Sequence, residues 1–120
     1  MKLGLDFGTS GARAAVLHSR DDLAFEIALP YPASELSSTA AWVDTLHALL
    51  HRIPRSLRAA IKAIAIAGTS ATCLICDDDG IPISDVLVYD DARATAEANR
   101  IAEFAPAGHI TRSATSTLAK

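Results

Sequence analysis

Residues 3–17 read Leu3-Gly4-Leu5-Asp6-Phe7-Gly8-Thr9-Ser10-Gly11-Ala12-Arg13-Ala14-Ala15-Val16-Leu17. This apolar run breaks at an acid, passes through two glycines and two hydroxyl residues, and becomes apolar again. Residues 3–7 and 12–17 are each long enough for a strand, and the four residues between them suit a tight reversal. We therefore predict two antiparallel strands joined by a Gly-Thr-Ser-Gly turn, with Asp6 at the end of the first strand.

This turn has the residue types of a phosphate-binding site. Glycines such as Gly8 and Gly11 let a backbone adopt positive φ and approach a bulky anion. Exposed N–H groups and the hydroxyls of Thr9 and Ser10 can then bind phosphate oxygens. Asp6 beside the turn is placed to bind Mg²⁺ through water, as phosphate-bound magnesium usually requires. An ordinary hairpin with a solvated acid is the alternative on these residues, and the turn is neither a Walker loop nor a dinucleotide fingerprint.

Three blocks of the sequence resemble the FGGY carbohydrate kinases, which belong to the actin-like ATPase superfamily. Residues 5–11 with Arg13 resemble the first phosphate motif of that family. Residues 63–72, Ala-Ile-Ala-Ile-Ala-Gly-Thr-Ser-Ala-Thr, resemble the segment after the first long helix in xylulokinases and ribulokinases. Residues 86–93, Val-Leu-Val-Tyr-Asp-Asp-Ala-Arg, resemble their strand-to-helix junction with an acidic pair and a nearby Arg. Three blocks in this order are far more specific than any one of them.

The resemblance implies an α/β fold, a ribonuclease H-like domain of the actin-like ATPase superfamily. The domain would be incomplete, with a three-stranded antiparallel start followed by α and β elements. Residues 1–120 would form the N-terminal portion of the first domain of a sugar kinase, with the second domain absent. The implied activity of the complete enzyme is ATP-dependent phosphorylation of a sugar or polyol, such as the ketopentoses D-xylulose or D-ribulose. ATP and Mg²⁺ are the implied cofactors.

The resemblance also assigns roles to individual residues. Asp6 would hold Mg²⁺ through water, and the phosphates of ATP would contact the turn and a nearby cation: Gly8, Thr9, Ser10, Gly11 and Arg13. The sugar would contact two later segments, through Thr69, Ser70 and Ala71 and through Asp90, Asp91 and Arg93. In the second segment one carboxylate would face the sugar and the other would cap a helix, with Arg93 bracing the site.

For both segments a plainer interpretation exists on the residues themselves. A polar loop at 69–72 can bond to its own backbone, and an Asp pair can simply cap a helix. Residues 69–72 also depart from the Gln-Met-His often found at this place in xylulokinases, so the resemblance leaves the sugar open. The general base, the second phosphate motif and the adenosine pocket would lie beyond Lys120. We therefore expect the 120-residue chain by itself to be inactive.

Composition narrows the class of protein. The chain has 120 residues, of which 50% are hydrophobic and 21% charged, which suits a globular α/β domain. A net charge of −3 argues against a nucleic-acid partner, which would require a basic surface. The N-terminus does not read as a signal peptide, and no apolar run approaches the length that spans a membrane. We expect a soluble, cytoplasmic chain.

Periodicity predicts the remaining elements. A polar turn at 18–22 leads into a third strand at 23–29, and a helix at 39–52 is capped by Ser37, Ser38 or Thr39. The apolar run 63–67 reads as a central strand covered on both sides. Later elements are two short strands around a solvated turn at 77–80, a strand at 86–89, a helix at 92–104 and a fraying tail at 109–120.

Two pairs of residues look like metal or redox sites but are better explained otherwise. Cys73 and Cys76 form a Cys-x-x-Cys within an expected strand, so they point to opposite faces and read as buried structural thiols. His47 and His51 share a helix spacing of four but lack the Glu of a zinc-protease motif, so we expect them on the surface.

Two other functional classes remain open. One is a non-catalytic or regulatory actin-like ATPase fragment, which would need the Asp-x-Gly-Thr turn but not the segments at 69–72 and 90–93. The other is a scaffold domain that keeps the fold without a ligand. Whichever applies, an incomplete domain leaves apolar surface open, so self-association into a homo-oligomer is a further hypothesis.

Overall fold

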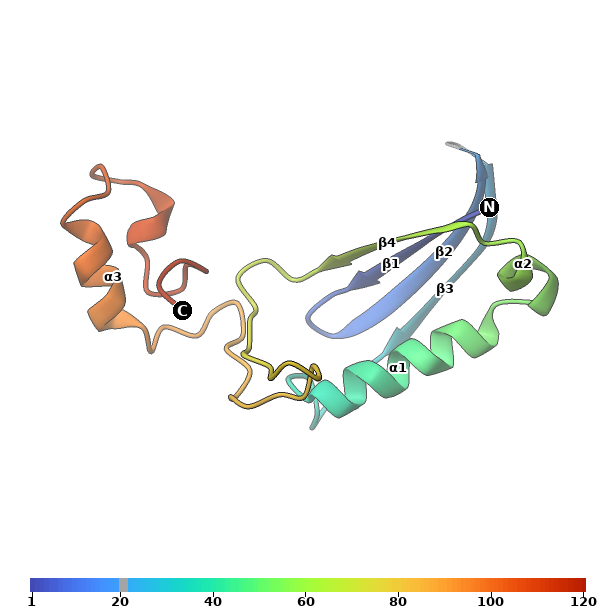
Figure 1. Cartoon of the computed structure of the whole chain (residues 1–120), viewed down its shortest axis with the longest axis horizontal. Helices are drawn as coiled ribbons and strands as arrows, with labels where there is room; N and C mark the ends of the chain where they lie inside the picture. Colours follow the sequence, from blue (N-terminus) through green and yellow to red (C-terminus); the bar gives the residue numbers. More distant parts are fainter. Residues whose placement is uncertain (20–21) are drawn as a thin grey trace. The chain divides into compact units, whose positions relative to one another are not determined.

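The computed structural model describes residues 1–19 and 22–120 (Figure 1). Part of the polar turn expected at 18–22 therefore lies outside the described residues. By their contacts the residues form two compact units, Met1–Gly68 and Thr69–Lys120.

The first unit is built on a four-stranded sheet with the order β3-β2-β1-β4. Strands β1 (Lys2–Phe7), β2 (Gly11–Ser19) and β3 (Asp22–Pro30) are antiparallel, which confirms the predicted start of the fold. Alternate residues of β1 and β2 are buried, so that one face of the sheet is apolar. This face carries Leu3, Leu5, Ala12, Ala14 and Val16.

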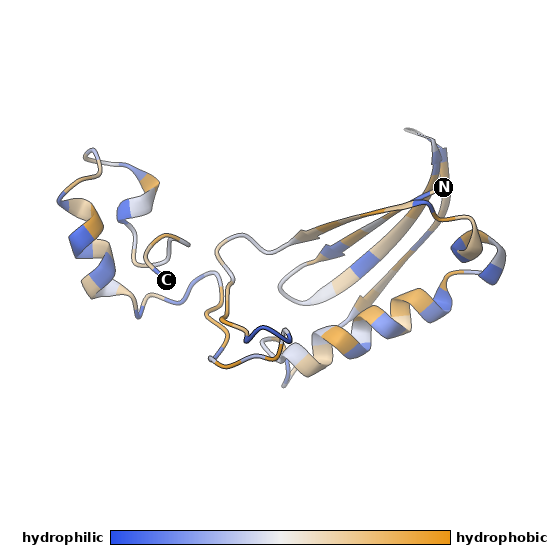
Figure 2. Ribbon diagram, viewed as in Figure 1, coloured by the Kyte–Doolittle hydropathy of each residue, from blue (hydrophilic) through white to orange (hydrophobic). Residues whose placement is uncertain are grey.

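Helix α1 (Thr39–Arg52) packs on this apolar face, and it has the bounds that its sequence predicts. Its N-cap is Ser38, whose side-chain oxygen accepts a hydrogen bond from the N–H of Ala41 at 3.3 Å. Apolar and polar residues alternate around the helix (Figure 2), and the apolar ones bring Leu49 and Ile53 into the core. The helix ends before Pro54, and a short helix, α2 (Arg55–Ala59), follows.

Strand β4 (Ala63–Gly68) pairs in parallel with β1 and lies at the edge of the sheet. The prediction that this run is covered on both sides is wrong. All six of its residues are exposed, and Ile64 and Ile66 keep 60% and 70% of their surface open. The apolar residues of this run favour a strand, and a strand forms. Among the described residues, however, nothing pairs with its outer edge or covers its faces.

The second unit contains less regular structure than the sequence predicts. The expected strands at 74–76, 81–83 and 86–89 are reduced to two isolated bridges, Cys73 to Leu87 and Cys76 to Pro82. The turn between them is a hairpin turn, as predicted. The Asp77 carboxylate accepts hydrogen bonds from two N–H groups of this turn, Asp79 at 3.1 Å and Ile81 at 2.8 Å.

Three further expectations for the second unit are wrong. Helix α3 (Thr95–Ala102) is shorter than predicted and begins later. The tail does not fray, because it forms a 3₁₀ turn, η1 (Ile110–Arg112), and buries Ala119 to 4% exposure. The cysteines are not buried thiols: Cys76 is exposed and Cys73 is half-buried, because each takes part only in an isolated bridge. In the first unit both predicted surface histidines are exposed.

Candidate functional site

The turn between β1 and β2 is fixed by backbone hydrogen bonds on two sides. The strands pair as far as Phe7 and Ala12, and the N–H of Gly8 then donates to the carbonyl of Gly11 at 2.9 Å. On the other side, the N–H of Tyr31 donates to the carbonyl of Ser10 at 3.0 Å. The turn is therefore held by β1, β2 and the end of β3, which makes it a rigid support for a ligand.

Thr9 and Ser10 lie at the tip of this turn and are exposed. Within the part of the chain that the structure describes, no partner is found for their hydroxyl groups or for their backbone N–H groups. Two hydroxyls and two N–H groups are thus available at one turn. Such a set of donors is suited to the oxygens of a phosphate group.

The glycines of the turn act differently from the prediction. Among the described residues, positive φ occurs at Gly80, Gly108 and Ala71, and not at Gly8 or Gly11. Instead, a side chain at Gly11 would meet the backbone of β3, where the Cα of Pro30 lies 2.9 Å from the position of a Cβ. The small residue at position 11 is required by the close approach of two strands.

Asp6 and Arg13 face each other across β1 and β2 and form an ion pair. The Nε atom of Arg13 lies 3.6 Å from Oδ2 of Asp6, and their side chains are 64% and 51% exposed. Such an exposed pair contributes at most about 1 kcal/mol, so either partner can exchange it for a ligand. Arg13 therefore lies beside the turn, as the predicted role requires.

Asp6 is the carboxylate that lines the turn, and this restricts the kind of metal ion that could bind there. No group of three or more His, Cys, Asp or Glu side chains that could hold a metal ion occurs among residues 1–19 and 22–120. Mg²⁺ is commonly bound by one or two carboxylates together with waters and phosphate oxygens. Asp6 fits that pattern as the protein ligand of a phosphate-bound Mg²⁺.

A cavity of about 380 Å³ opens beside the turn. It is lined by Asp6, by the turn residues 8–11, by Arg13 and by residues 28–30 at the end of β3. This volume falls within the range of small-molecule sites. The turn is therefore open, and its donors and the Asp6 carboxylate share one hollow.

Tyr31 supports the turn from the core, a role that the sequence analysis did not predict. Tyr31 is 5% exposed and belongs to the same buried cluster as Leu5 and Leu49, while its hydroxyl has no hydrogen-bond partner among the described residues. Burial raises the pKa of the Tyr31 hydroxyl, and the charge of Asp6 raises that pKa further.

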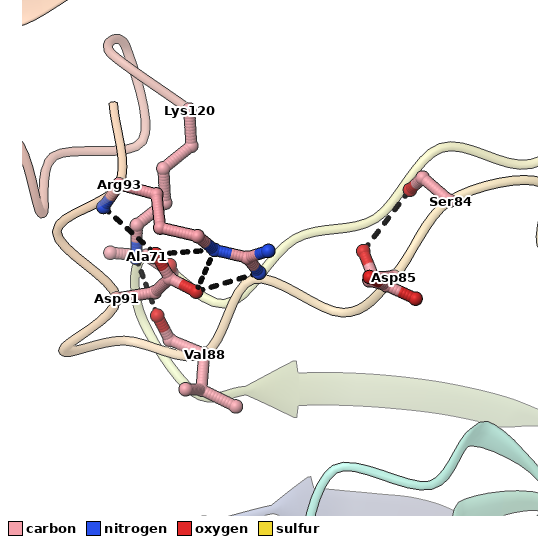
Figure 3. Close-up of polar contacts among 7 residues, drawn as sticks. All are labelled: Ala71, Ser84, Asp85, Val88, Asp91, Arg93 and Lys120. Atoms are coloured by element: carbon pink, nitrogen blue, oxygen red, sulfur yellow. Dashed lines mark hydrogen bonds and ion pairs between the residues drawn. The ribbon is translucent and has the colours of Figure 1, made fainter. Parts of the chain in front are cut away.

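The second candidate cluster lies in the other unit and centres on Asp91 and Arg93 (Figure 3). The guanidinium of Arg93 donates to both carboxylate oxygens of Asp91, with Nε at 3.1 Å from Oδ1 and 2.8 Å from Oδ2. The backbone N–H of Arg93 also donates to Oδ1 at 3.0 Å. The side-chain hydrogen bond from Arg93, and then the backbone one, lower the pKa of Asp91 below its ordinary value.

This arrangement corrects the expected capping role of the acidic pair. Helix α3 has Ala94 as its N-cap, and within the described residues no side chain makes a capping hydrogen bond there. Neither Asp90 nor Asp91 caps it, because Asp91 bonds to Arg93 two residues later and so closes a local turn first. Asp90 is exposed, and it is the member of the pair whose carboxylate has no recorded partner among the described residues. Arg93 holds Asp91, and its role in bracing a sugar site stays a prediction.

The loop at 69–72 lies in the same unit and is partly strained. Ala71 has φ of 59°, the left-handed region that non-glycine residues rarely adopt. The ammonium of Lys120 donates to the carbonyl of Ala71 at 2.8 Å and to that of Val88 (Figure 3). Lys120 thus joins Ala71 to the neighbourhood of Asp91, and nothing in the composition of the tail had suggested it. Within the described residues, neither Ser70 nor Asp90 takes part in the polar contacts of this cluster.

The comparisons with known proteins bear on the fold. No family model matches the sequence. Among solved structures, the chain is similar to a "xyloylose kinase" from Brucella ovis, with a TM-score of 0.69 and 19% sequence identity over 82% of this chain and 23% of that one. It is also similar to a xylulose kinase from Rhodospirillum rubrum, with a TM-score of 0.61 and 20% identity over 86% and 23% of the two chains.

A third structure, a gluconate kinase from Lactobacillus acidophilus, aligns with a TM-score of 0.56 and 13% identity over 85% of this chain and 22% of that one. The chain has the fold of the N-terminal part of these sugar kinases. This confirms the predicted α/β fold with its three-stranded antiparallel start. The chain spans 23% of the length of the Brucella ovis structure. Among the helices that the structure describes, none is both long and apolar enough to cross a bilayer.

Proposed function

We propose that this chain supplies the phosphate-binding turn and part of the sugar site of an FGGY-type, ATP-dependent carbohydrate kinase. The substrate in this proposal is a sugar or polyol, with ketopentoses such as D-xylulose or D-ribulose as the first candidates, and the protein acts in the cytoplasm. One observation carries the proposal: the donors of Thr9 and Ser10 have no partner among the described residues and share a cavity with the carboxylate of Asp6. The fold shared with known sugar kinases supports it.

Phosphoryl transfer depends mainly on positioning and on neutralising charge. In the proposed complex, the N–H and hydroxyl groups of Thr9 and Ser10 bind oxygens of the terminal phosphate of ATP. Asp6 holds a phosphate-bound Mg²⁺ through water, and the metal supplies positive charge to the phosphate oxygens. Arg13 leaves its weak ion pair with Asp6 and offsets the remaining negative charge on the phosphate.

The sugar site in this proposal comprises the loop at 69–71 and the segment 90–93. Asp90 accepts hydrogen bonds from sugar hydroxyls, because its carboxylate is exposed and has no recorded partner among the described residues. Arg93 holds Asp91 in one orientation, which leaves lone pairs of that carboxylate for a second hydroxyl. The general base of the reaction is not among the residues of this proposal. The 120-residue chain by itself should therefore bind ligands weakly without turnover.

Calorimetric titration of the 120-residue chain with D-xylulose, D-ribulose and ribitol tests the sugar site. We expect weak binding of at least one of these compounds, and we expect Asp90→Asn to lower its affinity by about tenfold, the effect of a lost charged hydrogen bond. Asp78→Asn is the matched control, because it removes an exposed carboxylate from the hairpin turn of the same unit. Binding of MgATP without binding of any polyol would favour a non-catalytic actin-like ATPase fragment. Robust sugar phosphorylation by the 120-residue chain would contradict the expectation that it does not turn over.

A further inference from the structure

The ammonium of Lys120 contacts two segments that lie far from it in the sequence. It donates to the carbonyl of Ala71, 49 residues earlier, and to the carbonyl of Val88, 32 residues earlier. Figure 3 shows the side chain reaching between these two segments, next to Asp91 and Arg93. An ammonium has three donors, so two are used here on backbone carbonyls and one remains.

Backbone pairing between the two segments stops just before this point. Cys73 and Leu87 exchange two backbone hydrogen bonds, of 3.0 and 2.9 Å. Beyond them the turn at 69–72 takes the chain out of the ladder, since the N–H of Thr72 donates back to Thr69 at 3.3 Å. Lys120 therefore joins the segments where the backbone ladder no longer does.

Ala71 needs such a support. Its φ of 59° is costly for a residue with a Cβ, and such conformations persist only where the surroundings impose them. The hydrogen bond from Lys120 to the Ala71 carbonyl fixes the direction of that peptide unit. The charge of Lys120 also contributes to the lowered pKa of Asp91, after the contributions of Arg93.

We propose that Lys120 is a positioning residue that fixes the loop at 69–72 against the segment 88–93 and thereby sets the shape of the sugar site. The inference rests on the proposed function, because Lys120 can shape a sugar site only if these two segments bind a sugar. The two segments that Lys120 joins contain all six residues assigned to the sugar: Thr69, Ser70, Ala71, Asp90, Asp91 and Arg93.

The test compares Lys120→Met, which keeps the length of the side chain but removes its donors, with Lys120→Arg, which keeps charge and donors. Arg100→Met is the control, because it removes an exposed cation from α3 in the same unit. The first readout is the NMR coupling constant that reports φ of Ala71, and the second is the titration midpoint of the Asp91 carboxyl. The amide signals of Cys73 and Leu87 show whether the unit stays folded.

We expect Lys120→Met to move Ala71 out of positive φ and to raise the Asp91 midpoint, whereas Arg100→Met leaves the Ala71 coupling unchanged and affects the midpoint less. Lys120→Arg should restore both readouts in part. If the chain binds one of the polyols, Lys120→Met should weaken that binding by about tenfold, and Lys120→Arg should rescue it. An unchanged Ala71 coupling and Asp91 midpoint in a folded Lys120→Met variant would overturn the proposal. If no polyol binds wild type, the proposed sugar site fails, and these two readouts still decide whether Lys120 holds the segments together.

Discussion

Gly11 lies so close to Leu29 that a Cβ atom at position 11 would stand 2.5 Å from the Leu29 carbonyl oxygen. The contact joins the first residue of β2 to the backbone of β3, which pairs with it through Pro30. Neither side can yield easily, because both are strand backbone. The start of the candidate phosphate turn is therefore fixed by the packing of two strands.

Gly11→Ala should consequently destabilise the first unit. We expect a loss of about 2–3 kcal/mol in the free energy of unfolding, the upper part of the range for overpacked sites. Gly8→Ala is the control, because a Cβ at position 8 would lie 3.4 Å from the carbonyl oxygen of Gly11 and needs only a small shift. Urea denaturation followed by circular dichroism measures both. Equal losses in the two variants would show that the close approach of β2 and β3 does not matter.

Tyr31→Phe tests the buried hydroxyl for which the described residues offer no hydrogen-bond partner. Since an unpaired buried polar group costs about 1–3 kcal/mol, its removal should leave the protein as stable as wild type, or more stable, at pH 7. At high pH the difference in unfolding free energy between Tyr31→Phe and wild type should grow. The pKa of Tyr31 is raised above 10.0 in the folded state, so stability is retained below pH 10.0 and lost as the pH rises through the folded pKa.

Urea denaturation between about pH 8 and pH 11 measures how the free energy of unfolding depends on pH. This range covers about one pH unit or more on each side of the ordinary tyrosine pKa. The decline in unfolding free energy above pH 10.0 should be smaller in Tyr31→Phe than in wild type. Tyr89→Phe, which removes an exposed hydroxyl, should follow wild type. A Tyr31→Phe profile that runs parallel to wild type would mean that burial does not hold this hydroxyl neutral.

For Asp91, in the second unit, we expect the opposite dependence of stability on pH. Its folded pKa is lowered below 3.8, mainly by the hydrogen bond from the Arg93 side chain, so its stabilising contribution is present above pH 3.8 and is lost as the pH falls through the folded pKa. We expect the amide signal of Arg93 to shift in that acidic range as its bond to Asp91 breaks. Asp91→Asn should abolish that titration, and Asp78→Asn should preserve it. A wild-type Arg93 signal that titrates at or above pH 3.8 would contradict the lowered pKa.

The open edge of β4 supports a prediction about self-association. Ile64 and Ile66 lie on one face of an exposed, apolar edge strand, which is a surface that other chains can pair with or cover. We propose that the 120-residue chain associates with itself through this edge. Ile66→Lys should shift sedimentation toward monomer, whereas Ile83→Lys, an exposed isoleucine in the second unit, should not. Clean monomer for wild type at high concentration would count against the idea.

The sequence was sufficient for those elements whose own periodicity specifies them. Apolar runs of strand length, separated by turn residues, predicted the three antiparallel strands, and the helical spacing of apolar residues predicted α1 with its observed bounds. It could not show whether β4 is covered, because an apolar run predicts a strand but not what packs against it. The same limit applied to Gly11, whose role depends on β3, a strand distant in the sequence.

For the candidate sites, the sequence identified residue types better than it identified partners. It placed Asp6, Thr9 and Ser10 at one turn, and the structure has them around one cavity. The resemblance implied that one aspartate of the pair would cap the helix, but Arg93 lies closer along the chain and bonds to Asp91 instead. Lys120 and Tyr31 were missed, since their roles rest on a bond across 49 residues and on burial in the core.

In the proposed function, the β1–β2 turn binds the phosphate end of a nucleotide, with Asp6 as the metal ligand. The direct measurement is an NMR titration of the isotope-labelled chain with ATP, with and without Mg²⁺, that follows the amide signals of Thr9 and Ser10. We expect saturable shifts at both amides. Asp6→Asn should weaken the Mg²⁺-dependent part of ATP binding by about tenfold, whereas Asp44→Asn, which removes an exposed acid from α1, should not. Amides of Thr9 and Ser10 that stay unmoved at saturating MgATP, or an Asp6→Asn variant that binds it as wild type does, would contradict the claim.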